Sequence, residues 1–210
     1  YYLDAMNDGL TAQASEEKVP GENLTGWIGE RINLPSVFRD ASKYWDGGYA
    51  LAGIIGNGDA FAMRDPLGIR PGFYFVDDEV VAVASERAPL MTVFEKKIDE
   101  VEEIKPGTLV LAKANGEVEV ERFADDPARQ TGCSFERIYF SRGNDADIYS
   151  ERKTLGALLV PSVIESVGPD FSKSVFSYIP NTAESAYYGF MEQLRLVRRA
   201  EVKQCLTDAR

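Results

Sequence analysis

The spacing of apolar residues changes part-way along the chain, at a mostly polar stretch over residues 123–132. Before this stretch, short apolar runs are separated by turn signals such as Asn57-Gly58, Asp77-Asp78 and Asn115-Gly116, a pattern typical of antiparallel strands. After it, longer runs with helical spacing predominate. The sequence therefore predicts two parts of different architecture, over residues 1–122 and 133–210, joined by a linker over residues 123–132.

The first part is predicted to consist mainly of short strands. Residues 1–34 are polar and give no clear signal for any element, whereas apolar residues from Ser36 onward recur at helical spacing and stop at Gly47-Gly48. A hairpin with its turn at residues 56–59 should follow. Further strands are predicted over residues 72–76, 80–84, 108–112 and 117–123.

The second part alternates between the two kinds of pattern. Strand-like residues 137–140 precede a helical run over residues 150–167, and strand-like residues 175–179 precede a helix over residues 183–199. A strand–helix–strand–helix order predicts the start of an α/β domain with a parallel sheet.

Composition excludes several classes of function. The chain has no histidine and only two cysteines, so histidine-based catalytic triads, zinc sites and a disulfide scaffold are excluded within it. A net charge of −11 with interspersed acids and bases argues against nucleic-acid and anionic-membrane partners, since phosphate contacts need a basic face. No membrane span or leader pattern is present, which predicts a cytoplasmic protein, and both ends of the sequence resemble cuts within a longer chain.

Two loops in the first part invite a functional interpretation. In the stretch from Arg64-Asp65-Pro66 to Arg70-Pro71, the prolines fix φ and Asp65 is placed to cap backbone amides, which favours a stiff architectural turn over catalysis. Asn57-Gly58 could polarise a carbonyl as an oxyanion hole, but a hairpin turn explains the same pair better.

The loop over residues 179–185 is predicted to lie where a strand ends and a helix begins. A helix N-terminus favours phosphate, with the hydroxyl of Thr182 or Ser185 assisting directly or through a metal ion. A capping motif, with Asn181 as N-cap and Glu184 three residues later, explains the loop as well, and the two interpretations are compatible. Cys133, with no histidine to lower its pKa, is expected to be a buried or idle thiol and not a nucleophile.

Taken in order, several runs resemble the amidophosphoribosyltransferase family. These are GYALAGII (48–55), FAMRDPLGIRP (61–71), ASE (84–86), IKPG (104–107), CSFERIYFSR (133–142) and YSER (149–152), followed by Leu155-Gly156. The resemblance covers roughly residues 40–195. It implies an α+β chain that holds the latter part of an N-terminal-nucleophile glutaminase, an αββα sandwich, followed by the start of a type I phosphoribosyltransferase domain.

The resemblance also implies a reaction and its partners. The family hydrolyses glutamine to ammonia, which passes through an internal channel and displaces diphosphate from phosphoribosyl diphosphate to give phosphoribosylamine, the first step of purine synthesis. A family position at the Mg²⁺ and diphosphate site matches Thr182, although Asn181 replaces the usual acidic residue before it. A channel-lining aromatic matches Tyr139, for which core packing is the alternative. A homo-oligomer is expected, and an iron–sulfur cluster at Cys133 is not, because its partner cysteines lie outside this chain.

The same resemblance implies that this segment holds no catalytic residue. The family's nucleophilic cysteine lies upstream of the matched region and its Asp-Asp loop lies downstream, so the segment alone is expected to be inactive. A noncatalytic regulatory or assembly module derived from the family remains an alternative. Another glutamine amidotransferase, such as the hexosamine-forming enzyme, shares only the glutaminase half.

Overall fold

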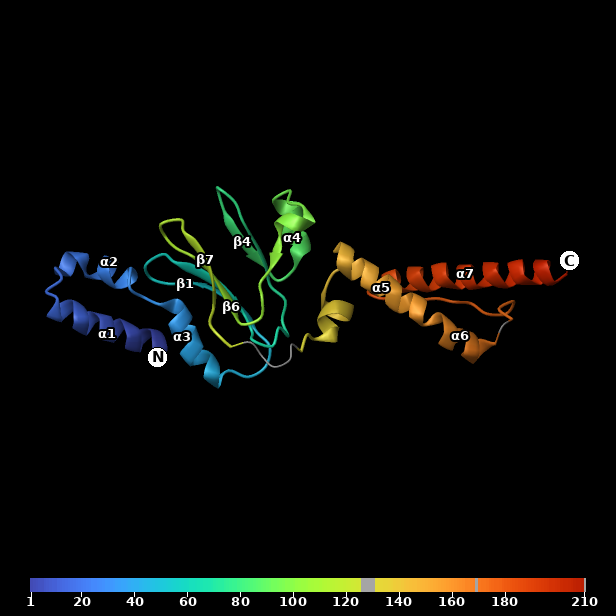
Figure 1. Cartoon of the computed structure of the whole chain (residues 1–210), viewed down its shortest axis with the longest axis horizontal. Coiled ribbons are helices and arrows are strands. Elements are labelled where there is room, and N and C mark those ends of the chain that lie inside the picture. Colours follow the sequence, from blue (N-terminus) through green and yellow to red (C-terminus); the bar gives the residue numbers. More distant parts are fainter. Residues whose placement is uncertain (126–130, 169, 210) are drawn as a thin grey trace. The chain divides into compact units, whose positions relative to one another are not determined.

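A computed structural model describes residues 1–125, 131–168 and 170–209. The chain forms two compact units, Tyr1–Cys133 (unit 1) and Ser134–Arg210 (unit 2), whose elements are labelled in Figure 1. Half of the predicted linker, residues 126–130, lies outside the described residues. Within the described ranges, no helix combines the length and the apolarity needed to cross a membrane.

Unit 1 begins with helices that the sequence did not indicate. Residues 1–34 hold α1 (Tyr2–Glu16), a 3₁₀ turn η1 (Gly21–Asn23) and α2 (Leu24–Gly29). The helix predicted from Ser36 is α3 (Leu34–Ala41), which continues as the 3₁₀ turn η2 (Ser42–Tyr44). It starts earlier than predicted because the side chain of Asn33 accepts a hydrogen bond from the Ser36 amide at 2.8 Å, a typical N-cap.

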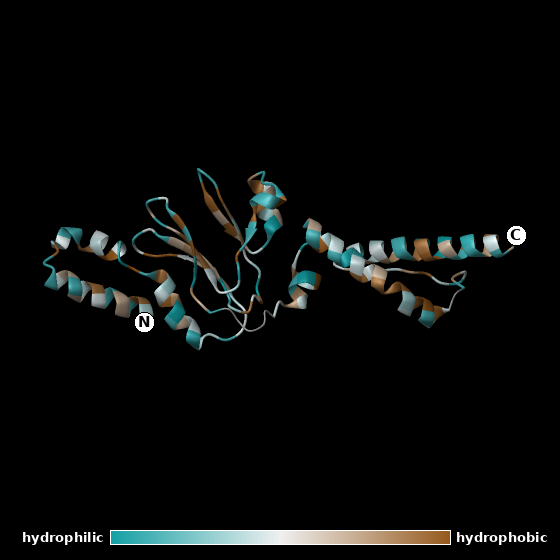
Figure 2. Ribbon diagram, viewed as in Figure 1, coloured by the Kyte–Doolittle hydropathy of each residue, from teal (hydrophilic) through white to brown (hydrophobic). Residues whose placement is uncertain are grey.

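The predicted strands of unit 1 are confirmed, and all of them pair antiparallel. A four-stranded sheet has the order β1 (Ala50–Ile54), β2 (Ala60–Arg64), β6 (Thr108–Ala112), β7 (Val118–Arg122). A three-stranded sheet has the order β4 (Val81–Ala84), β3 (Phe73–Val76), β5 (Glu102–Glu103). The sequence missed β5, α4 (Arg87–Val93) and the 3₁₀ turn η3 (Ile98–Glu100). Figure 2 shows hydrophobic residues along these strands and hydrophilic ones in their loops.

The period-two alternation of the strands sorts their side chains into layers. Met63 and Leu109 of the four-stranded sheet pack with Leu34 of α3. Val110, the next residue along β6, points to the opposite face and packs with Tyr74 of the three-stranded sheet.

The second sheet repeats this arrangement toward α4. Tyr74 faces the first sheet, whereas Phe75 packs with Leu90 of α4 and with Val101. The layers of unit 1 therefore follow the order helix, sheet, sheet, helix.

All regular secondary structure among the described residues of unit 2 is helical. The unit contains a π-helix η4 (Glu136–Phe140), then α5 (Ala146–Leu158), α6 (Val160–Val167) and α7 (Glu184–Asp208). The two predicted helices are confirmed as α5 with α6 and as α7. The predicted strands over residues 137–140 and 175–179 are wrong: the first forms η4, and the second makes no sheet pairing among the described residues.

Two glycines set the close approach of α5 and α7. A Cβ atom at Gly156 would lie 1.7 Å from the Ala186 carbonyl oxygen, and one at Gly189 would lie 1.9 Å from the Lys153 carbonyl oxygen. Only glycine permits backbones to meet this closely. A small core of Val160, Phe190 and Leu194 completes the packing.

Candidate functional site

The Arg64-Asp65 turn of unit 1 is a closed structural network, as the sequence predicts. Asp65 is fully buried (0% exposed), and its two carboxylate oxygens accept the amides of Ile69 and Arg70, each at 2.9 Å. Gly68 takes a positive φ of 69°, which its lack of a Cβ allows. The Asp65 carboxylate is therefore used to hold the turn together.

Arg64 completes this network. It is 8% exposed, and its Nη1 donates to the Glu103 carboxylate at 2.7 Å and to the Ile104 carbonyl at 2.9 Å. Its Nη2 donates to the Gly68 carbonyl at 3.1 Å. The guanidinium is thus charge-paired and hydrogen-bonded inside the fold, as a buried cation requires.

Asn57-Gly58 forms the predicted hairpin turn and not an oxyanion hole. The Asn57 side-chain amide donates to the Gly29 carbonyl at 3.2 Å and to the Asp59 carboxylate at 2.9 Å. The Gly58 amide donates to the Ile55 carbonyl at 2.9 Å, and Gly58 has a positive φ of 95°. These donors are already used within the turn.

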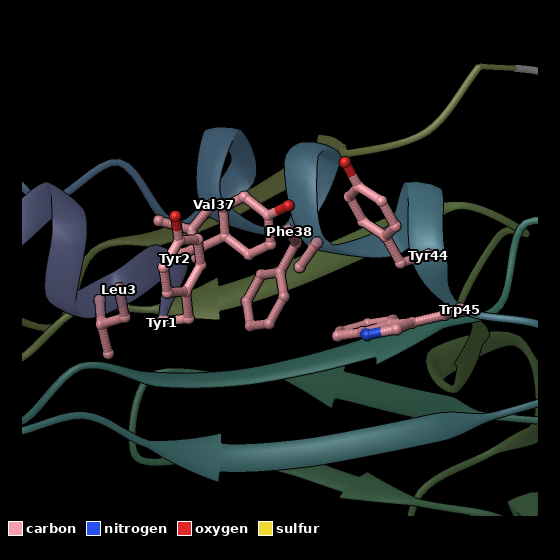
Figure 3. A pocket seen from close by; sticks show the side chains of 8 residues that line it. Tyr1, Tyr2, Leu3, Val37, Phe38, Tyr44 and Trp45 are labelled. Carbon is pink, nitrogen blue, oxygen red and sulfur yellow. The ribbon is translucent and has the colours of Figure 1, made fainter.

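An aromatic hollow of about 440 Å³ lies where the start of α1 meets α3 and η2 (Figure 3). It is lined by Tyr1, Tyr2, Leu3, Val37, Phe38, Ala41, Tyr44 and Trp45. The lining carries no charged side chain, so it lacks the groups that bind an amino-acid zwitterion or a phosphate. We do not place glutamine or phosphoribosyl diphosphate there.

Thr182 lies in the turn that leads into α7. Its side chain is half-buried, and its hydroxyl makes no side-chain hydrogen bond with any other described residue. The capping interpretation of this loop is wrong, because the N-cap of α7 is Ala183 and no side chain caps the helix. Glu184 instead accepts a hydrogen bond from the Tyr188 hydroxyl, which raises the pKa of Tyr188 to about 12.

Tyr139 lies on η4 and is 63% exposed. Its only aromatic neighbour among the described residues is Phe140, in an edge-to-face contact with ring centroids 5.3 Å apart. The core-packing interpretation is therefore wrong for this chain, and the channel role stays a prediction.

Arg152 of α5 contacts the segment that carries Tyr139, and the sequence did not single it out as a site residue. It is 5% exposed, with Nε donating to the Arg137 carbonyl at 3.2 Å and Nη2 to the Ser141 carbonyl at 2.7 Å. Its bonds therefore hold both ends of the segment that carries Tyr139, and its burial lowers the pKa of its guanidinium. The sequence did contain a signal for the burial of Arg152. Ile148, Arg152 and Gly156 recur every four residues and share the buried face of α5.

The described residues offer few groups that could bind a metal ion. No group of three or more His, Cys, Asp or Glu residues in the described ranges is placed to hold a metal ion. Cys133 is a half-buried thiol and Cys205 an exposed one. Thr182 thus offers a hydroxyl without a surrounding carboxylate cluster.

Sequence comparison decides the family. The chain is 32% identical over 172 residues to the amidophosphoribosyltransferase of Escherichia coli (strain K12). This alignment covers 77% of the chain. It is 31% identical over 202 residues, or 90% of this chain, to that of Methanocaldococcus jannaschii. The chain is a homologue of the amidophosphoribosyltransferases. The chain spans only 33% and 41% of the lengths of these two relatives.

Solved structures show the same fold. An enzyme of B. subtilis described as a glutamine phosphoribosylpyrophosphate amidotransferase, complexed with ADP and GMP, matches 89% of this amidophosphoribosyltransferase homologue and 41% of its own chain, with a TM-score of 0.60 and 23% identity. A second match, described as the allosteric regulatory enzyme of purine biosynthesis, gives the same TM-score. No protein-family profile matches the chain.

Proposed function

We propose that this chain is the middle part of an amidophosphoribosyltransferase that uses glutamine-derived ammonia to convert phosphoribosyl diphosphate to phosphoribosylamine. In this proposal unit 1 is the latter part of the glutaminase domain, and unit 2 is the start of the phosphoribosyltransferase domain. Glutamine and phosphoribosyl diphosphate are the substrates of the complete enzyme, which we expect to be a cytoplasmic homo-oligomer.

The observation that carries the proposal is the extent of the homology. The alignment with the M. jannaschii relative runs over 202 residues, so it must cross the boundary between units 1 and 2. A glutaminase-only relative, such as a hexosamine-forming enzyme, has no counterpart of unit 2. The helix–sheet–sheet–helix order of unit 1 supports the assignment of its domain.

Two residues of unit 2 receive roles in this proposal. The Thr182 hydroxyl, which no other described side chain engages, binds an oxygen of the diphosphate at the start of α7. Tyr139, exposed on η4, lines part of the ammonia path, where an apolar surface keeps ammonia unprotonated.

Magnesium belongs to the complete enzyme in this proposal. The described residues form no cluster of carboxylates or thiolates that could hold the ion, and Thr182 supplies a single hydroxyl. Mg²⁺ usually takes most of its ligands from substrate phosphates and water, so the ion is proposed to arrive with the diphosphate. We derive no step through it.

No residue of this segment is proposed to be catalytic. A glutaminase of this type uses an N-terminal cysteine whose own α-amino group acts as the base, and the amino groups of Cys133 and Cys205 are both held in peptide bonds. We therefore expect the 210-residue chain to release no glutamate from glutamine and to consume no phosphoribosyl diphosphate. Either activity in a contaminant-free preparation would contradict the assignment.

The test of the function uses the complete gene product. Diphosphate release that requires both phosphoribosyl diphosphate and either glutamine or ammonia is the expected result. Thr182→Ala should impair use of phosphoribosyl diphosphate while glutamate release from glutamine continues. Unchanged transfer kinetics in this variant would remove Thr182 from the site.

A noncatalytic module derived from the family is the second candidate. The observation that favours it is Asn181, an exposed amide at the position where the family usually carries an acid. This candidate predicts that the complete gene product has neither activity, even with ammonia supplied directly. Asn181→Asp in the complete protein should then leave both activities absent.

A further inference from the structure

The helix η4 is not fixed in place by apolar packing. None of its residues is buried. Its large apolar side chains and that of its N-cap are each between 47% and 63% exposed: Phe135, Ile138, Tyr139 and Phe140. Burial of apolar surface therefore contributes little to the position of η4 on unit 2.

Polar bonds from α5 hold η4 instead. Arg152 Nε donates to the Arg137 carbonyl at 3.2 Å, and Arg152 Nη2 donates to the Ser141 carbonyl at 2.7 Å. The Ser141 hydroxyl donates to the same Arg137 carbonyl at 2.9 Å, and the Ser141 amide donates to the Glu136 carbonyl at 2.8 Å. One guanidinium thus fixes the backbone on both sides of Tyr139.

A second link between η4 and α5 is weaker. Arg137 forms an ion pair with Glu151, and these side chains are 51% and 48% exposed. Water and salt screen an exposed pair of this kind, so it contributes little to stability. Arg152 is only 5% exposed, so its hydrogen bonds are protected from water. The buried arginine is therefore the main polar anchor of η4.

Burial of Arg152 has a cost that the geometry of η4 explains. Among the described residues, no carboxylate pairs with Arg152, and an aliphatic side chain on this face of α5 would avoid the burial of a charge. An aliphatic side chain could not bind a carbonyl. A guanidinium is a planar fork that can fix two carbonyl oxygens at once. What Arg152 supplies is therefore the conformation of the segment between these two carbonyls.

We propose that Arg152 is a positioning residue for ammonia transfer, because it fixes η4 and with it the exposed Tyr139 ring in the wall of the ammonia path. This inference rests on the proposed function for the reaction and for the role of Tyr139. It adds a residue that acts on the path without touching ammonia. An apolar wall excludes water only while the rings that line it stay in place. If η4 loosens, water enters, and ammonia is protonated before it reaches phosphoribosyl diphosphate.

The first test follows both products of the complete enzyme. Arg152→Lys keeps the charge but replaces the planar fork with a single ammonium group, which cannot fix both carbonyls. Glutamate release should be unchanged, whereas phosphoribosylamine formed per glutamate should fall about tenfold, since small misplacements of positioned groups have effects of this size. Transfer from ammonia supplied in excess should be unchanged. Loss of both activities in proportion would indicate a merely structural role and overturn the proposal.

A double-mutant cycle tests whether Arg152 acts through Tyr139. Tyr139→Leu should lower the same product ratio, and Arg152→Lys should then lower it no further, because the two changes affect one path. Losses that multiply would show that Arg152 acts elsewhere. Lys153→Gln is the control, since it alters the next residue of α5, whose ammonium group is paired with Glu192. This control should leave the ratio unchanged.

The anchor itself is tested in the 210-residue chain, without any reaction. In Arg152→Lys the Ser141 amide should exchange its hydrogen about tenfold faster than in the wild type, because local opening of η4 becomes easier. The amide of Gly156, farther along α5, should exchange at the wild-type rate. Equal protection of Ser141 in the two proteins would exclude Arg152 as the anchor of η4.

The outcomes separate this inference from the proposed function. An Arg152→Lys enzyme with the wild-type product ratio, or a Tyr139→Leu enzyme with that ratio, would exclude the inference and leave the proposed function intact. A wild-type enzyme that forms no phosphoribosylamine from either nitrogen source would remove both. Hydrogen exchange at Ser141 would still show whether Arg152 holds η4.

Discussion

The two units each bury an arginine, and they treat it differently. Arg64 of unit 1 donates to the Glu103 carboxylate and to backbone carbonyls within a turn whose Asp65 is itself fully hydrogen-bonded. Arg152 of unit 2 meets only carbonyls and one hydroxyl, and its Nη1 has no acceptor among the described residues. The buried arginine of unit 1 is therefore charge-paired inside its network, whereas that of unit 2 is held by neutral acceptors.

The apolar residues follow the same contrast. The three core clusters of unit 1 fill the spaces between helix and sheet layers. Unit 2 has one cluster around Phe190, and it leaves Phe135, Leu158 and Val175 exposed. Unit 2 therefore exposes the larger share of its large apolar side chains. This agrees with the proposal that unit 2 is the start of a larger domain.

The largest expected effect tests whether unit 2 depends on its helix contact. Gly189→Ala places a Cβ 1.9 Å from the Lys153 carbonyl oxygen, and backbone cannot yield as a flexible side chain can. We expect unit 2 to lose about 4 kcal/mol or more of unfolding free energy, because α5 and α7 must separate. Chemical denaturation followed by the resonances of α7 measures it.

The same substitution in α1 serves as the control. Gly9 lies within α1, and a Cβ there meets nothing within 4 Å. Gly9→Ala should stabilise unit 1 by about 0.5–1 kcal/mol through helix propensity. Equal responses of the two variants would show that the glycine contact does not hold unit 2 together.

The next effect tests the closed network of unit 1. Asp65→Ala leaves the amides of Ile69 and Arg70 without acceptors. We expect a loss of about 3 kcal/mol, since two part-buried backbone donors lose their acceptor. Thermal unfolding of unit 1 measures it, and Asp78→Ala, at an exposed carboxylate, should change stability by less than about 0.5 kcal/mol. A small loss for Asp65→Ala would show that water replaces the carboxylate and that the turn is open after all.

Local patterns explain which elements could be predicted. The strands β1, β2, β6 and β7 alternate in sequence and are bounded by turn residues, so both register and face follow from neighbours in the chain. Helix α1 gave no signal because Ala14 is its only buried residue. Strand β5 is only two residues long, too short for any periodicity.

The two strand predictions in unit 2 are wrong because neither segment has a neighbouring strand to pair with among the described residues. Residues 137–140 and 175–179 have strong strand propensity, but a strand needs a neighbour to pair with. In the first segment, the carbonyl of Arg137 instead accepts from Arg152 and from the Ser141 hydroxyl. In the second, the Phe176 carbonyl accepts from the Tyr187 hydroxyl at 3.0 Å. The bonds from Arg152 and Tyr187 join residues 15 and 11 positions apart, which no local pattern encodes.

The site shows the same limit. Thr182 could be proposed from the resemblance, because it lies in a motif of adjacent residues. The bonds from Arg152 to the carbonyls of Arg137 and Ser141 depend on how η4 folds back against α5. Only the structure brings these residues together.

A smaller effect compares two tyrosines of unit 1. The Tyr49 hydroxyl is buried without a hydrogen-bond partner among the described residues, and burial raises the pKa of Tyr49 to about 12. The Tyr74 hydroxyl donates to the Glu102 carboxylate at 2.9 Å. Tyr49→Phe should therefore stabilise unit 1 by about 1 kcal/mol and Tyr74→Phe should destabilise it by about as much, as measured by urea unfolding. Destabilisation by Tyr49→Phe would mean that an ordered water molecule binds the Tyr49 hydroxyl.

The smallest expected effect tests whether a surface ion pair, between Asp77 and Lys96, stabilises unit 1. A hydrogen bond from Lys96 at 2.7 Å, with help from the amides of Glu79 and Val80, lowers the pKa of Asp77 to about 2. A carboxylate with a lowered folded-state pKa stabilises the fold above its unfolded pKa of about 4, and this stabilisation is lost as pH falls toward 2.

Lys96→Gln isolates this contribution, because every other carboxylate titrates in both proteins. The difference in unfolding free energy between the wild type and Lys96→Gln should be constant from pH 7 to about pH 4 and then shrink between about pH 4 and pH 2. Urea unfolding across this range measures it. A difference that stays constant to pH 2 would mean that Lys96 acts through its contact with the Phe75 ring, 4.9 Å away, and not through the carboxylate. The ion pair between Asp77 and Lys96 would then contribute nothing measurable to the stability of unit 1.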